Sequence, residues 1–392
     1  MGRKNRTVCM SVEDSVRAGV CEQLLAGKLK EADAAERLRL SVRQVRRLKR
    51  RVREEGPSGV VHRLRGEASG RRTSEEVRQE VVRLYRERYA GWNMVHFSEY
   101  LGSRHKIRLS SETLRQVLLN AESRPRRRHR SRHRQWRERR RCEAELVQMD
   151  TSIHAWLGED GESVVLISAV DDATSRILRA EFFEHNGVLE NLTVVRDLVA
   201  TYGLPASLYT DHHTIFFLCE EDALAARERG EDGLTQFGRV MKRLGIEMIP
   251  AGSPQAKGRV ERSYRTLQDR LLKELRLEGI RTRSAANGYL RRCFIPKYNR
   301  QFGVEPAQTE TAWVDADGID EHDVFCLRDT RVVQNDATIS VNGQTWQLEG
   351  RVRSGQKVEL RTWLDGTVHV FKGDREIAYH PVRKPRSAAA TC

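Results

Sequence analysis

The sequence predicts a multidomain protein with an all-α N-terminal region, a central mixed α/β domain and a small β domain near the C-terminal end. The chain has 392 residues, and about two to four domains are expected because a single hydrophobic core rarely grows so large. The first third repeats apolar residues at helical spacing, and the middle alternates strand-like and helix-like runs. The last part alternates apolar and polar residues between turn sequences.

The composition is strongly basic. Lys and Arg number 70 against 55 Asp and Glu, which gives a net charge of +15. This balance favours a polyanionic partner, either nucleic acid or an acidic membrane surface, and charge alone does not choose between them. Apolar runs are too short to cross a bilayer and the first residues lack the apolar core of a signal peptide, so we expect a cytoplasmic protein.

The seven cysteines are scattered along the chain and none is paired as Cys-x-x-Cys. Neither a disulfide framework nor a zinc knuckle is therefore expected.

The first domain, expected over 1–66, contains a helix-turn-helix pattern. Helices are predicted over 12–26, 30–38 and 42–53, with Ser41 as the N-cap of the last. A solvated basic helix in an ordinary bundle would look similar, but here the turn and the basic face coincide, which favours DNA binding. The side chains of the last helix that suit base edges or phosphates in a major groove are Arg43, Gln44, Arg46, Arg47 and Arg50.

A second helical domain is expected over 74–122. Its third helix begins at the capping residue Ser110 and resembles a second recognition helix, although a structural bundle would give much the same pattern. An Arg-rich linker follows over 123–142, with Glu138 as its acid between 124 and 141. So dense a cationic run should not enter a core, and we expect it to contact the phosphate backbone.

The domain at 143–300 alternates element types. Three strands are followed by helix, strand, helix, strand and a long helix, so a mixed sheet with helices on both faces is predicted. The expected ranges are 145–157, 163–170, 176–183, 188–202, 207–210, 234–244, 246–249 and 255–277. Beyond it, 322–383 predicts a small β-barrel or sheet of about five strands, and the tail at 384–392 is expected to be disordered.

Three acids stand at informative places in the central domain. Asp150 lies inside an apolar strand, Asp211 ends another strand, and Glu261 lies near the start of the long helix. A buried carboxylate is costly unless it is paired or bound to metal. If the first and fourth strands are neighbours, the two aspartates converge, and Glu261 lies at the edge of the helix face that should pack on the sheet, which is formed by Val260, Tyr264, Leu267, Leu271 and Leu275.

These acids and their surroundings resemble the DDE triad of retroviral-integrase-like transposases, most closely the ISNCY group of bacterial insertion-sequence transposases. Asp150 follows Gln-Met, Asp211 follows Tyr-Thr, and Glu261 ends Ser-Pro-Gln-Ala-Lys-Gly-Arg-Val-Glu. The similarity covers most of the chain and includes the segments 148–157, 171–174, 235–237 and 266–271.

The sequence departs from the integrase pattern in two ways. Asp211 and Glu261 are 261 − 211 = 50 residues apart, more than the integrases usually have, and we assign the surplus to an insertion at 216–232. The His-His-Cys-Cys zinc module of retroviral integrases is absent from the sequence. Neither departure touches the three acids.

The resemblance implies an RNase-H-like core in which Asp150, Asp211 and Glu261 hold two Mg²⁺ or Mn²⁺ ions. Carboxylate oxygens suit such hard cations, and two ions about 4 Å apart can activate a water or a DNA 3′-hydroxyl and stabilise the leaving oxygen. The implied partners are double-stranded DNA, as terminal inverted repeats and target, and a second copy of the chain, since two ends must be paired. No membrane partner is expected.

Three cations beside Glu261 are candidate phosphate contacts or simply solvated side chains: Lys257, Arg259 and Arg262. Asp171 and Asp172 follow a buried strand and suit a turn better than catalysis. The alternative function is a catalytically inactive or repurposed integrase-fold regulator, which the intact triad disfavours. A nuclease without strand transfer would share the triad but would not need tandem helix-turn-helix units.

Overall fold

The computed structural model describes residues 10–62, 65, 72–123, 138–159, 161–252 and 258–382. The chain divides into two compact units, 1–84 and 85–392, which we describe separately. Most of the predicted Arg-rich linker, the candidate phosphate contact Lys257 and the predicted tail lie outside the described residues.

The first unit begins with three helices close to their predicted positions. They are α1 (Val12–Leu25), α2 (Glu31–Leu38) and α3 (Val42–Glu55), followed by a short 3₁₀ turn, η1 (Pro57–Val60). The chain turns between α2 and α3 with Arg39 in the left-handed conformation, at φ 52°. The predicted cap Ser41 accepts a hydrogen bond from the Gln44 amide. Buried small and branched residues such as Ala34 and Val45 hold the helices together.

Helix α4 (Glu75–Glu87) crosses the division between the units, and α5 (Met94–Arg104) and α6 (Ser111–Asn120) follow it. These are the helices that the sequence predicts for the second helical domain. Their packing uses aromatic rings, with Tyr89 in contact with Trp92 and Phe97 at centroid distances of 5.0 and 5.2 Å.

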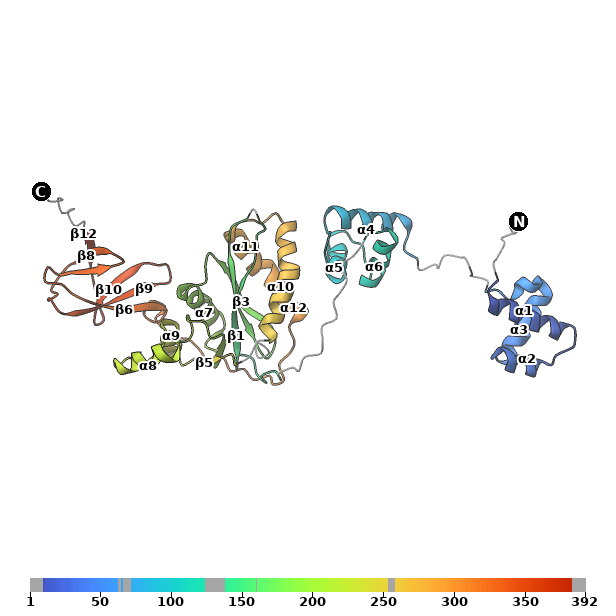
Figure 1. The fold of residues 1–392 in the computed structure, drawn as a ribbon, viewed down its shortest axis with the longest axis horizontal. Coiled ribbons are helices and arrows are strands. Elements are labelled where there is room, and N and C mark those ends of the chain that lie inside the picture. Colours follow the sequence, from blue (N-terminus) through green and yellow to red (C-terminus); the bar gives the residue numbers. More distant parts are fainter. Residues whose placement is uncertain are drawn as a thin grey trace. The chain divides into compact units, whose positions relative to one another are not determined.

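The central domain is built on a five-stranded mixed sheet in the order β3-β2-β1-β4-β5. The first three strands are antiparallel, and β4 and β5 run parallel to β1. Figure 1 shows α7 on one side of the sheet and α10 on the other. The predicted mixed α/β architecture is therefore confirmed. The strands are β1 (Val147–Ile153), β2 (Val165–Asp171), β3 (Ile177–Phe183), β4 (Ser207–Thr210) and β5 (Glu247–Pro250).

Each face of the sheet has its own apolar core. On one face, Val147, Met149 and Ile167 pack with α7 (Val188–Tyr202) and α9 (Gln236–Leu244). On the other face, residues such as Leu166 and Phe182 pack against α10 (Gly258–Leu277). The apolar face predicted for α10 is the face that is buried, and its members are Val260, Tyr264, Leu267, Leu271 and Leu275.

The segment that the sequence assigned to an insertion contains a helix, α8 (Glu220–Glu228). The sequence did not predict the helical segment that follows α10. It comprises α11 (Arg283–Tyr289), the π-helical turn η3 (Leu290–Phe294) and α12 (Ile295–Phe302). Asn287 accepts a hydrogen bond from the backbone of Phe182, and Asn299 pairs with the backbone of Ile177. Backbone groups of the sheet's edge strand β3 are thus satisfied by side chains, which protects that edge.

The C-terminal module differs from the predicted barrel of about five strands. A four-stranded sheet, β11-β10-β9-β6, and a three-stranded sheet, β12-β8-β7, share one apolar core, and no closed barrel is present in the described part of the chain. The sequence shows the strand-like runs but not which strands pair across them. The strands are β6 (Cys326–Val332), β7 (Thr338–Val341), β8 (Gln344–Leu348), β9 (Lys357–Trp363), β10 (Val368–Lys372), β11 (Arg375–Ile377) and β12 (Tyr379–Val382).

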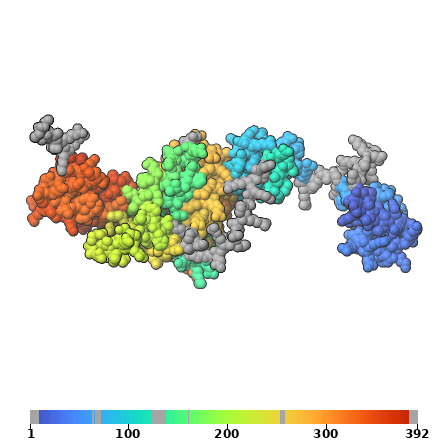
Figure 2. All heavy atoms as spheres, viewed as in Figure 1, coloured from blue at the N-terminus to red at the C-terminus, as the bar shows by residue number. Residues whose placement is uncertain are grey.

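This module packs directly against the central domain, as the space-filling view shows (Figure 2). The short helix α13 (Glu321–Val324) leads into Phe325, which is buried in the core beneath α7 and α9. Gln236 also pairs with the backbone of Arg328 through hydrogen bonds of 2.6 and 3.1 Å.

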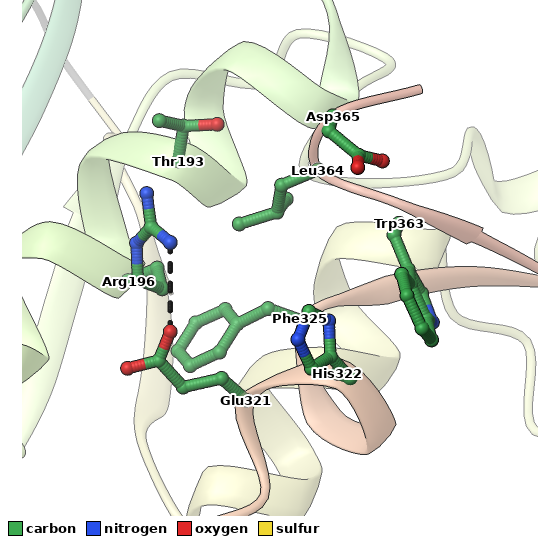
Figure 3. A pocket seen from close by; sticks show the side chains of 8 residues that line it. All are labelled: Thr193, Arg196, Glu321, His322, Phe325, Trp363, Leu364 and Asp365. Atoms are coloured by element: carbon green, nitrogen blue, oxygen red, sulfur yellow. Dashed lines mark hydrogen bonds and ion pairs between the residues drawn. The ribbon is translucent and has the colours of Figure 1, made fainter. Parts of the chain in front are cut away.

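A cavity of about 260 Å³ lies between α7 and the module (Figure 3). Arg196 and Glu321 meet at 3.5 Å beside it. Because α7 and α10 cover opposite faces of the sheet, this cavity is separated from the acid on α10. Its lining residues are Thr193, Arg196, Glu321, His322, Phe325, Trp363, Leu364 and Asp365.

Helix α10 is also held from its outer side, by α5. His96 of α5 contacts Glu274 at 2.8 Å, and both side chains are buried, at 0% and 1% exposed. Glu99 forms a bidentate pair with Arg270, at 2.6 and 3.2 Å. The helix that carries Glu261 is thus fixed between the sheet and the second helical domain. No helix in the described residues is long and apolar enough to span a membrane.

We expect Leu267→Ala to lower the free energy of unfolding of the central domain by about 2–5 kcal/mol, because Leu267 is 0% exposed and its loss leaves a cavity. Leu224→Ala is the matched control, since Leu224 of α8 is 58% exposed and should change stability by less than about 0.5 kcal/mol. Denaturant titrations compare the two. Equal losses would show that α10 is not packed as described.

We expect acidification to weaken the packing of α5 on α10. Burial lowers the pKa of His96 below its ordinary 6.5, aided by Arg270 and Lys297 and opposed by Glu274. Burial raises the pKa of Glu274, but hydrogen bonds led by that from His96 outweigh it and hold the pKa at about 2. Both groups bind more protons when unfolded, so stability falls as the pH drops below about 6.5 and again below about 4.5.

This pH dependence is measured by thermal unfolding of the wild type and His96→Gln at pH 7.5 and 5.5. The glutamine keeps a donor for Glu274 and does not titrate, so its melting temperature should fall less between the two values. His154→Gln removes an exposed histidine and should follow the wild type. An unchanged pH dependence in His96→Gln would contradict the buried neutral imidazole.

Candidate active site

Asp150 lies on β1, and Asp211 directly follows the neighbouring parallel strand β4. In the β1–β4 pair, Val147 is opposite Leu208 and Gln148 is opposite Tyr209, an offset of 208 − 147 = 61. Carried past these printed pairs, the same offset matches Asp150 with residue 150 + 61 = 211, which follows the last residue of β4, Thr210. Adjacent strands are about 4.8 Å apart, and residues in register project to the same face. The first and fourth strands are neighbours, which is the condition under which the sequence lets the two aspartates converge.

Asp150 faces α10. Val147 and Met149 belong to the core beneath α7, so their neighbours Gln148 and Asp150 project to the opposite face, because side chains alternate along a strand. The amide of Val260, in the first turn of α10, donates to Oε1 of Gln148 at 3.2 Å. Glu261 follows directly, so the start of α10 is held over the face that carries Asp150.

Tyr264 ties the next turn of α10 to the same strand. Its hydroxyl donates to the backbone carbonyl of Asp150 and, at 3.2 Å, to that of Leu166. Burial raises the pKa of Tyr264 well above its ordinary value, so the hydroxyl keeps its proton and remains a donor. The helix is thereby positioned against the backbone that carries one of the predicted acids.

The three acids are partly exposed, and their oxygen donors suit hard divalent cations. Within the described ranges, however, no group of three or more His, Cys, Asp or Glu side chains is close enough to hold a metal ion. Asp150 and Glu261 lie on elements that contact each other, because the first two turns of α10 are hydrogen-bonded to Gln148 and to the backbone of Asp150.

A buried charge network lies beside these acids. Asp172, at 0% exposed, accepts from Nε of Arg259 at 2.8 Å and from Nε2 of Gln148 at 2.6 Å. Its other carboxylate oxygen accepts from the amide of Arg140 at 2.8 Å. Asp171 serves the turn instead, accepting from the amide and the hydroxyl of Thr174.

The sequence therefore predicts the role of Asp171 but misses that of Asp172. Gln148 could have indicated that role, because it shares a strand face with Asp150 and its side-chain amide needs a hydrogen-bond partner when buried. The sequence also places Arg259 among the phosphate contacts. In the structure its side chain is 8% exposed and is engaged by Asp172, so burial disfavours that role. Arg262 is exposed at the surface of α10.

The candidate DNA contacts of α3 fall into two groups. Arg43, Arg47 and Arg50 are exposed. Gln44 and Arg46 are exposed as well but already have protein partners: Gln44 accepts from the Ser41 amide at 2.9 Å, and Arg46 pairs with Glu31 at 2.7 Å.

The comparisons with known proteins decide the family. A protein named as a transposase, y4bF of Sinorhizobium fredii (strain NBRC 101917 / NGR234), is 36% identical over 373 residues, covering 93% of this chain and 80% of the relative. The chain belongs to the transposase family. The transposase for insertion sequence IS1202 of Streptococcus pneumoniae is 30% identical over 319 residues, covering 72% of this chain and 67% of the relative. No protein-family model matches the sequence.

Solved structures give weaker likenesses. A simian T-cell lymphotropic virus intasome in complex with PP2A regulatory subunit B56 gamma has a TM-score of 0.34 and 13% identity, covering 78% of this chain and 100% of that one. The HTLV-2 integrase catalytic core domain in complex with magnesium has a TM-score of 0.28 and 16% identity, covering 39% of this chain and 88% of that one. Membership of the transposase family rests on the two related sequences.

Proposed function

We propose that this transposase binds the terminal inverted repeats of an insertion sequence and catalyses metal-dependent DNA cleavage and strand transfer. The catalytic residues are Asp150, Asp211 and Glu261. The observation that supports the proposal is that β4, which Asp211 follows, is the parallel neighbour of β1, which carries Asp150, while the first turn of α10 with Glu261 is hydrogen-bonded to β1.

In this proposal Asp150, Asp211 and Glu261 would hold two Mg²⁺ or Mn²⁺ ions, which would supply activation of a water or a DNA 3′-hydroxyl and stabilisation of the leaving 3′-oxygen. The chain's own residues supply the geometry. Gln148 and Tyr264 fix the first two turns of α10 on β1, so Glu261 approaches the two aspartates from a rigid helix rather than from a loop. Rigid support of this kind limits the reorganisation needed for reaction.

The DNA is bound by the helical domains in this proposal. Exposed arginines of α3 approach base edges and phosphates in a major groove, and α6 serves as a second recognition helix. Because α5 packs on α10, DNA on the second helical domain is carried by a body that includes Glu261. Joining two transposon ends requires two bound copies, so the active form on DNA is at least a dimer.

We expect Glu261→Gln to abolish end cleavage and strand transfer, lowering the rate by more than about a hundredfold, because an amide is a poor ligand for a hard cation. Binding of the ends should persist, since the first helical unit is unchanged. The assay uses DNA bearing the inverted repeats that flank the gene, with Mg²⁺ or Mn²⁺, and follows nicked and joined products on a denaturing gel.

Glu228→Gln is the matched control for this assay, because Glu228 is an exposed residue of α8. This variant should cleave the DNA ends at the wild-type rate. Cleavage by Glu261→Gln at the wild-type rate would disprove the assignment of Glu261. A wild-type protein that binds the ends without any metal-dependent cleavage would instead support a DNA-binding regulator.

We expect the double variant Arg47→Ala/Arg50→Ala to lower affinity for the transposon ends at least about tenfold and to reduce the slope of log affinity against log salt by about 1 to 2. Fluorescence anisotropy at several salt concentrations measures both. Arg229→Ala/Arg239→Ala removes two partly exposed arginines outside the proposed interface and should leave both quantities unchanged. Equal effects in the two double variants would mean that net charge, not α3, governs binding.

A further inference from the structure

The buried network around Asp172 joins the three parts of the chain that must be aligned at the site. Asp172 begins the turn after β2, Gln148 lies on β1 two residues before Asp150, and Arg259 precedes Val260 and Glu261 in the first turn of α10. One carboxylate oxygen, Oδ1 of Asp172, accepts from both Gln148 and Arg259. We propose that Asp172 is a positioning residue that sets the place of Glu261 relative to Asp150.

The hydrogen bonds of this network fix the orientation of the Gln148 side-chain amide. Gln148 uses its Nε2 to donate to Asp172 at 2.6 Å, which leaves its Oε1 turned to accept from the Val260 amide at 3.2 Å. Asp172 therefore decides which end of the Gln148 amide faces α10. If the carboxylate were replaced by a donor, the amide of Gln148 could turn over and present its own N–H to Val260, where two donors would oppose each other.

Burial makes the arrangement stiff. Asp172 is 0% and Arg259 is 8% exposed, and Gln148 is fully buried. An ion pair out of water needs all its lone pairs and protons satisfied, so its geometry is narrowly defined. The backbone amide of Arg140 donates a hydrogen bond to the second carboxylate oxygen of Asp172, Oδ2, at 2.8 Å. The first turn of α10 is thus set by fixed polar contacts in addition to its apolar residues.

A substitution at the neighbouring residue Asp171 distinguishes an effect on the position of α10 from an effect on the folding of the turn. It is also 0% exposed, and it accepts from the amides of Ala144 and Thr174 and from the Thr174 hydroxyl. Its carboxylate thus serves the turn and the segment before β1. A substitution at Asp171 perturbs the same turn at the same depth, which makes it the matched control for Asp172.

The inference rests on the catalytic role proposed for Glu261, so its test has one measurement that needs no activity. In metal-free full-length protein, we expect Asp172→Asn to speed hydrogen exchange at the Val260 amide by about tenfold or more, because the bond to Gln148 is lost or weakened. Asp171→Asn should leave this amide as protected as in the wild type. Exchange is followed by mass spectrometry with fragmentation to single amides.

The second measurement is the Mn²⁺ concentration that gives half-maximal end cleavage. Changes to residues that orient metal ligands typically cost 10–100-fold in affinity or activity, so we expect the Mn²⁺ midpoint to rise at least about tenfold in Asp172→Asn. The maximal rate at high Mn²⁺ should recover, and end binding should be unchanged. A role in folding alone would not be rescued by metal.

Arg259→Gln removes the cationic partner of Asp172 and replaces Asp172→Asn in both measurements if that variant does not fold. It should give the same two changes, and the double variant should show less than their sum, since both substitutions break one pair. An unchanged midpoint in a folded variant, or the same shift in Asp171→Asn, would overturn the inference. If the wild type does not cleave at all, the proposed function fails, while the Val260 exchange still decides whether Asp172 positions α10.

Discussion

The structure depends on the packing of α10 against one face of the central sheet. Its apolar residues, from Val260 to Leu275, are buried against β2 and β3, and this burial supplies most of the free energy that holds the helix. Apolar contact is non-directional, however, and it fixes a helix less sharply than hydrogen bonds do. Two hydrogen bonds provide the directional contacts: the buried hydroxyl of Tyr264 donates to the backbone carbonyl of Asp150, and the Val260 amide donates to the side chain of Gln148. Both acceptors lie on β1.

The outer side of α10 also makes buried contacts, and these are polar. Glu274 is buried between His96, Tyr289 and Lys297, with contacts of 2.7 to 2.8 Å. Since one carboxylate joins the second helical domain to the segment after α10, removal of any partner would leave a buried charge poorly compensated. Helix α10 thus has a second role in the fold, because it connects α5 to the central sheet.

The sequence predicts those features that leave a periodic pattern. The apolar face of α10 and the helix at 188–202 follow from 3.6-residue spacing. The pair between Asp172 and Arg259 spans 87 residues and has no local pattern, so Asp172 could be predicted as a turn residue only. The pairing of the C-terminal strands is non-local in the same way, which explains why the sequence predicts a barrel or sheet but not the division of its strands into two sheets. The helices after α10 are a different case, because Leu290, Phe294 and Tyr298 recur at helical spacing and could have been recognised.

The start of α10 is held to β1 by hydrogen bonds that lie outside its apolar face. The Val260 amide donates to Gln148, and the Tyr264 hydroxyl donates to the backbone carbonyl of Asp150. Because hydrogen bonds are directional, they fix the rotation and height of the helix more narrowly than apolar burial does. A buried residue that orients one of these acceptors, as Asp172 orients Gln148, therefore influences where the first turn of α10 lies, although it belongs to a turn far away in the sequence.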